Sequence, residues 1–98
     1  MIITKEKVVE IIGIEELLNQ INRFQNSDIS IEFEGMIISQ VYIKLLEINK
    51  NKDYLIIKYG ENQKIKLNIH QIAKIAMHDK KTFMIKFDAL QMVKILLY

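Results

Sequence analysis

The acidic and nucleophilic side chains of this sequence are not arranged for catalysis. Two carboxylate pairs stand out, Glu15 with Glu16 and Glu32 with Glu34. Such pairs do acid–base chemistry only when one carboxyl is desolvated. The first pair fits the first turn of a helix, where the helix dipole favours acids, and the second fits the exposed face of a strand. No serine lies in a nucleophile-elbow motif, and there is no glycine-rich phosphate loop. We therefore predict a non-enzymatic protein without catalytic residues.

Metal and cofactor chemistry has few candidate ligands. The sequence contains no cysteine, so a thiolate zinc site is impossible, and its only histidines are His70 and His78. A site built on both would need a third ligand, which the neighbouring sequence does not nominate. His78 precedes Asp79 and two lysines in a segment that predicts a charged turn. We expect no metal ion and no cofactor.

Lys64, Lys66 and His70 are the candidate nucleic-acid-binding residues. They share strand parity, so they should project from one face of a strand. The basic residues are 13 lysines and a single arginine, against 12 acids. Lysine reads phosphates and bases less specifically than the planar guanidinium of arginine. The alternative interpretation is therefore that the lysines keep the outer face hydrated and guard strand edges against aggregation.

The N-terminal region has helical periodicity with a break at Gly13. Apolar residues after the break fall on one helical face, whereas those before it fall on nearly the opposite face. We predict a helix from Ile14 to Phe24, ended by the sequence Asn26-Ser27-Asp28. The segment before Gly13 fits a short helix or a strand.

From Asp28 onward the apolar period becomes two, which is typical of β-strands. The predicted strands are 29–34, 36–48, 54–59, 64–70 and 83–87, with a short strand or helical turn at 72–77. Residues 91–98 fit a strand or a helix that begins at Ala89. We favour the strand, because Val93 and Ile95 are β-branched.

These elements predict a single domain over residues 1–98. Residues 1–27 form a helical N-terminal segment, and residues 28–98 form a β-barrel or bent sheet. The fold class is α+β and mostly β, with the helix capping a small bent antiparallel sheet or barrel of five to seven strands.

The order of a helix followed by bending strands resembles the Sm-like fold, which includes the bacterial Hfq RNA chaperones. The segment 29–35 resembles the first Sm strand with its turn glycine, and 54–75 resembles the strand pair of the second Sm motif. His70 falls at the histidine of the bacterial Tyr-Lys-His signature, whose Lys and His help to bind uridines, but Ile69 replaces the lysine. A second glycine expected in the bent strand is also missing. The resemblance implies a ring or edge-to-edge assembly, and small barrels of SH3 type or pleckstrin-homology-like sheets would give similar patterns.

Adjacent apolar residues occur inside the predicted strands, at 37–38, 45–46 and 56–57. Neighbours on a strand point to opposite faces, so the sheet should be apolar on both sides at these places. One helix cannot cover the second side completely. We therefore predict a homo-oligomer and assign Ile37, Leu46 and Ile57 to its interface.

The remaining features of the chain bear on compartment and partners. The absence of cysteine, the early charges at Lys5 and Glu6, and the lack of an apolar run of roughly 20 residues predict a cytoplasmic protein without membrane contact. The predicted function is a small interaction or assembly module that self-associates and binds a macromolecular partner, which is a protein or RNA. The alternative is an Sm-like RNA-binding ring.

Overall fold

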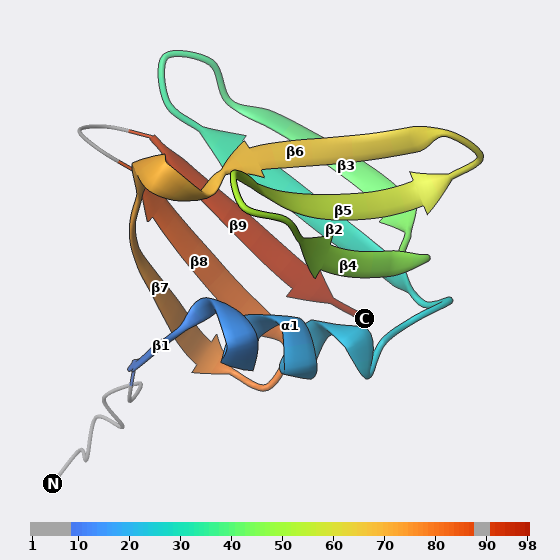
Figure 1. Ribbon diagram of the computed structural model, residues 1–98, viewed down its shortest axis with the longest axis horizontal. Helices are drawn as coiled ribbons and strands as arrows, with labels where there is room; N and C mark the ends of the chain where they lie inside the picture. Colours follow the sequence, from blue (N-terminus) through green and yellow to red (C-terminus); the bar gives the residue numbers. More distant parts are fainter. Residues whose placement is uncertain (1–8, 88–90) are drawn as a thin grey trace, which may run out of the picture.

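The structure of the protein is a computed structural model, and residues 9–87 and 91–98 are described. Over these residues the chain forms nine strands, one α-helix and one short 3₁₀-helix. The strands make two antiparallel sheets that enclose the core between them (Figure 1). The expectation of a mostly β protein with one N-terminal helix is confirmed. Five to seven strands was too few, and the sheets do not close into a barrel.

The larger sheet contains six strands in the spatial order β1-β7-β8-β9-β2-β3. Every neighbouring pair in it is antiparallel. Its members in chain order are β1 (Glu10–Ile12), β2 (Asp28–Glu34), β3 (Ser39–Lys44), β7 (Ile72–Asp79), β8 (Thr82–Phe87) and β9 (Met92–Leu97). The predicted strand for the C-terminal stretch is confirmed, because β9 lies between β8 and β2 in the middle of this sheet.

The smaller sheet contains β4 (Glu47–Lys50), β5 (Tyr54–Gly60) and β6 (Gln63–Asn68) in that order. The chain enters it from β3 through Leu45 and Leu46, and leaves it for β7 through the 3₁₀-helix η1 (Ile69–Gln71). The predicted strand 36–48 is therefore wrong as one element. It is divided into β3 and β4, because the chain changes sheets between them.

The core follows the two-residue period read from the sequence. In β2, Ile29 and Ile31 are buried against their partners Leu97 and Ile95 in β9. The smaller sheet contributes Leu55, Ile57 and Leu67, which join the same buried cluster. Since the inward side chains of both sheets meet, the two layers share one hydrophobic core.

The helix α1 (Ile14–Asn22) covers one end of this core, beside β4 (Figure 1). Leu17 and Ile21 are fully buried, and Glu15 and Glu16 lie in its first turn as predicted. The turn after the helix contains Asn26, which has a positive φ of 67°. Its backbone N–H donates to the carbonyl of Leu45 at 2.6 Å, which fixes the entry into β2.

The helical N-terminal segment predicted for residues 1–27 is shorter in the structure. The helix ends at Asn22, and Glu10–Ile12 is a strand that pairs with β7 around Ala76. Residues 1–8 lie outside the described residues. Of the helix and the strand considered for the segment before Gly13, residues 10–12 form the strand, because they pair with the edge of β7.

Of the three adjacent apolar pairs, two lie between strands and one lies within a strand. Residues 37 and 38 lie in the connection between β2 and β3, and Leu45 and Leu46 lie at the crossing between the sheets. In the pair within β5, Ile57 is buried and Ile56 is half-buried. The pair within β5 thus has apolar side chains on both faces as predicted, whereas the prediction fails at 37–38 and 45–46, because a strand's alternation does not continue through a loop or a corner.

Candidate functional site

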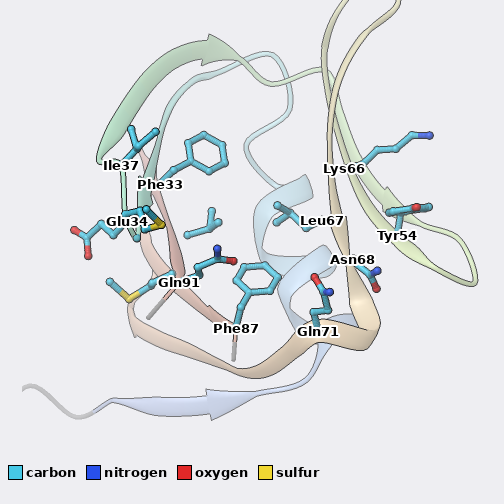
Figure 2. A pocket seen from close by; sticks show the side chains of 14 residues that line it. Phe33, Glu34, Ile37, Tyr54, Lys66, Leu67, Asn68, Gln71, Phe87 and Gln91 are labelled. Carbon is cyan, nitrogen blue, oxygen red and sulfur yellow. The ribbon is translucent and has the colours of Figure 1, made fainter. Parts of the chain in front are cut away.

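A groove lies at one end of the two-sheet core (Figure 2). Its volume is about 540 Å³, within the range of sites that bind small molecules or peptide side chains. The ends of β2, β6, β8 and β9 meet here, together with η1 and the connection from β2 to β3. The groove therefore collects residues that are far apart in the sequence.

The inner surface of the groove is apolar. Phe33, Leu67 and Phe87 point toward one another from β2, β6 and β8 (Figure 2). Leu67 is buried, whereas both phenylalanines keep part of their surface exposed. The amide side chains of Gln71 and Gln91 lie at the same opening, so the rim offers hydrogen-bond donors and acceptors around an apolar interior.

An exposed apolar loop forms one wall of the groove and extends from it. Met36, Ile37 and Ile38 are 103%, 78% and 80% exposed. Met36 and Ile37 also line the groove itself. Three consecutive apolar residues at this exposure are unusual on a protein surface, since contiguous apolar patches mark interaction sites. We call residues 36–38 the apolar loop.

Lys64 and Lys66 lie on the outer face of the smaller sheet. Lys64 is directly opposite Lys58 in β5, and the Lys66 ammonium lies 5.2 Å from the centre of the Tyr54 ring. Figure 2 shows Lys66 and Tyr54 directed away from the inner surface of the groove. Tyr54 and Lys66 nevertheless belong to the lining of the groove, so the basic surface begins at its rim, next to the apolar interior.

The two histidines lie in different surroundings. His70 is in η1 and not in the strand predicted for it, and its Nε2 lies 3.1 Å from Oδ1 of Asp53. The oxygen Oδ1 of Asn68 accepts the backbone N–H of His70, which stabilises this turn. His78 lies in β7 instead of a turn. His70 thus follows the two lysines along the chain without sharing their strand.

The three residues assigned to an interface have different environments. Ile37 is in the apolar loop, and Leu46 is 42% exposed at the crossing between the sheets. Ile57 is only 1% exposed within the core of the chain. Ile37 and Leu46 can thus contact another molecule, but Ile57 faces the shared core and cannot.

Sequence reasoning placed Phe33 and Phe87 on apolar strand faces but did not bring them together. It also missed the groove positions of Leu67, Gln71 and Gln91. The available signal was that each phenylalanine is the last inward-facing residue of its strand. The sequence does not show which strand ends lie side by side, because their neighbours depend on the order of the strands in the sheets.

Within residues 9–87 and 91–98, no group of three or more histidine, aspartate or glutamate side chains could hold a metal ion. Among the same residues, no helix has the length and apolarity required to cross a membrane.

No family model, curated protein or solved structure matches this chain.

Proposed function

We propose that this protein is a non-enzymatic interaction module that self-associates through the open end of its two-sheet core. The apolar loop of one copy occupies the groove of a second copy, and the second loop occupies the first groove. The observation that carries the proposal is the exposure of Met36, Ile37 and Ile38 beside an apolar groove on the same chain.

Self-complementarity supports a second copy as the occupant. A two-fold interface places the same patch of both subunits together, so it needs a protruding and a recessed surface side by side. Here the loop protrudes, and Phe33, Leu67 and Phe87 line the recess next to it. The loop and these recessed residues are both apolar, so their contact would remove apolar surface of both copies from water.

The expected affinity is modest. Fully burying one such side chain contributes about 1.5–3 kcal/mol, and a reciprocal contact would bury the three side chains of each loop. Association itself costs about 4–15 kcal/mol. Since the gain exceeds the cost by only a few kcal/mol, we expect a weak dimer with a Kd of roughly millimolar.

Sedimentation velocity from micromolar to near-millimolar protein tests this proposal. The mass should rise from one chain toward two as the concentration increases. Ile37→Asn should keep the protein monomeric, because the amide would be buried without partners in the apolar groove. Ile11→Asn is the matched control, since Ile11 is 59% exposed in β1, outside the groove.

A strict monomer at every concentration would overturn self-association. Equal loss of the dimer in Ile37→Asn and in Ile11→Asn would also overturn it. Co-sedimentation of the protein with lipid vesicles, without any dimer, would identify the apolar loop as a membrane contact and would also reject the proposal.

The second candidate is an Sm-like RNA-binding ring. It is favoured by Lys64 and Lys66, which lie on one exposed face with Tyr54. Fluorescence anisotropy with oligo-U and oligo-A at two salt concentrations tests it. RNA binding by lysines should weaken steeply with salt, and no binding at micromolar protein would remove this candidate.

A further inference from the structure

The outer edge of β6 is the second feature that suggests a partner. β6 is the last strand of the smaller sheet, and among the described residues no strand pairs with its outer side. Such an edge is a template for an added strand, because it offers unpaired backbone N–H and C=O groups.

The hydrogen bonds of neighbouring residues show which peptide groups of β6 are free. The N–H of Ile69 donates to the carbonyl of Asp53 at 2.9 Å, on the side facing β5. Hydrogen-bonded pairs alternate along an antiparallel ladder, so Leu67 and Ile65 also face β5. The backbone groups of Lys64 and Lys66 are therefore directed toward the free edge.

The side chains beside this edge form two rows of different chemistry. Lys64 and Lys66 lie on the outer face with Lys58, and within the strands of the smaller sheet the only acid is Glu47, which lies opposite Lys58. Ile65 and Leu67 point to the inner side, where Leu67 also lines the groove. A strand added here would place alternate side chains beside lysines and beside apolar residues.

From this placement we propose that β6 accepts an extended partner segment in which acidic and apolar residues alternate. The backbone of the segment pairs with Lys64 and Lys66, its acidic side chains lie opposite these lysines, and its apolar side chains extend the inner face beside Ile65 and Leu67. This inference rests on the proposed role as an interaction module and names the chemical class of its partner.

A protein segment fits this edge better than RNA does. The ordered backbone groups at Lys64 and Lys66 match another peptide backbone, and phosphates and bases would leave them unused. The Tyr54 ring, which could stack on a base, already carries the Lys66 ammonium at 5.2 Å. The sole arginine, Arg23, lies at the end of α1, outside the smaller sheet.

The test uses the monomeric Ile37→Asn protein and fluorescein-labelled peptides, so its outcome does not depend on self-association. An eight-residue peptide alternating Glu and Val should bind, and its Lys–Val counterpart should not. The double variant Lys64→Gln with Lys66→Gln should weaken binding roughly tenfold. Lys74→Gln with Lys86→Gln is the matched control, because these opposed lysines lie in the other sheet.

Methylation of the peptide backbone separates strand addition from simple charge attraction. The glutamates opposite the lysines should direct their N–H groups to β6, whereas the valines direct theirs to solvent. N-methylation of the glutamates should therefore abolish binding, and N-methylation of the valines should leave it nearly unchanged.

Absence of Glu–Val binding at millimolar peptide overturns the proposal, as does an equal loss from both methylation patterns. Binding of oligo-U that requires Lys64 and Lys66, without binding of the Glu–Val peptide, would instead assign this edge to RNA. Since self-association is measured separately by sedimentation, failure of one proposal is distinguishable from failure of the other.

Discussion

The side-chain amide of Asn22 makes two hydrogen bonds with the backbone of Ile48, in the way that the backbone of a neighbouring strand would. Its Nδ2 donates to the Ile48 carbonyl at 2.9 Å, and its Oδ1 accepts the Ile48 N–H at 3.1 Å. The amide at the end of α1 thus satisfies an edge position of β4, the strand at one side of the smaller sheet. This contact joins the helix to the sheet that it covers and leaves β6 as the open edge of that sheet.

Loss of this pairing should destabilise the protein. Asn22→Ala leaves both backbone groups of the buried residue Ile48 without their partner, so we expect the free energy of unfolding to fall by about 1–3 kcal/mol in urea titrations. Asn19→Ala is the control, because Asn19 is exposed on the same helix. Equal stability of the two variants would mean that water replaces the Asn22 amide without loss.

Truncation of Ile57 and truncation of Leu46 should lower the free energy of unfolding by very different amounts. Ile57→Ala removes a side chain that is 1% exposed in the shared core, and we expect it to lower the free energy of unfolding by about 2–5 kcal/mol. Leu46→Ala should lower it by less than about 1 kcal/mol, since Leu46 is 42% exposed. Chemical denaturation of both variants measures the difference, and a reversed order would contradict the placement of the two residues.

The backbone conformation of Asn26 gives a third prediction. At a φ of 67°, a residue with a Cβ is disfavoured unless it is Asn or Asp, whereas glycine is tolerated. Asn26→Ala should therefore reduce stability by about 1–2 kcal/mol, and Asn26→Gly should have a much smaller effect. Thermal unfolding by circular dichroism compares them. A Gly variant as unstable as the Ala variant would show that the side chain matters more than the backbone conformation.

Added salt should change the affinities of the two proposed contacts differently. Self-association through Met36, Ile37 and Ile38 buries apolar side chains, so its Kd should change little between low and high sodium chloride. Binding of the Glu–Val peptide depends on exposed charges at Lys64 and Lys66, so its Kd should rise as salt screens them. Sedimentation and anisotropy at the same two salt concentrations provide the comparison. A dimer that dissociates with added salt would point to a charged interface instead.

The sequence by itself determined where the helix begins, where most of the strands lie, and which faces several of them bury. The break at Gly13, the strand Asp28–Glu34 and the buried row of Ile29 and Ile31 were all readable, because they depend on residues a few positions apart. The tertiary structure alone decided that Leu45 and Leu46 mark a crossing between sheets, that Ile57 is core, and that Phe33 and Phe87 line one groove. It also decided that Asn22 covers the edge of β4, while no strand of the described residues pairs with the outer edge of β6. These relationships join distant segments, and local periodicity carries no information about which strand lies beside which.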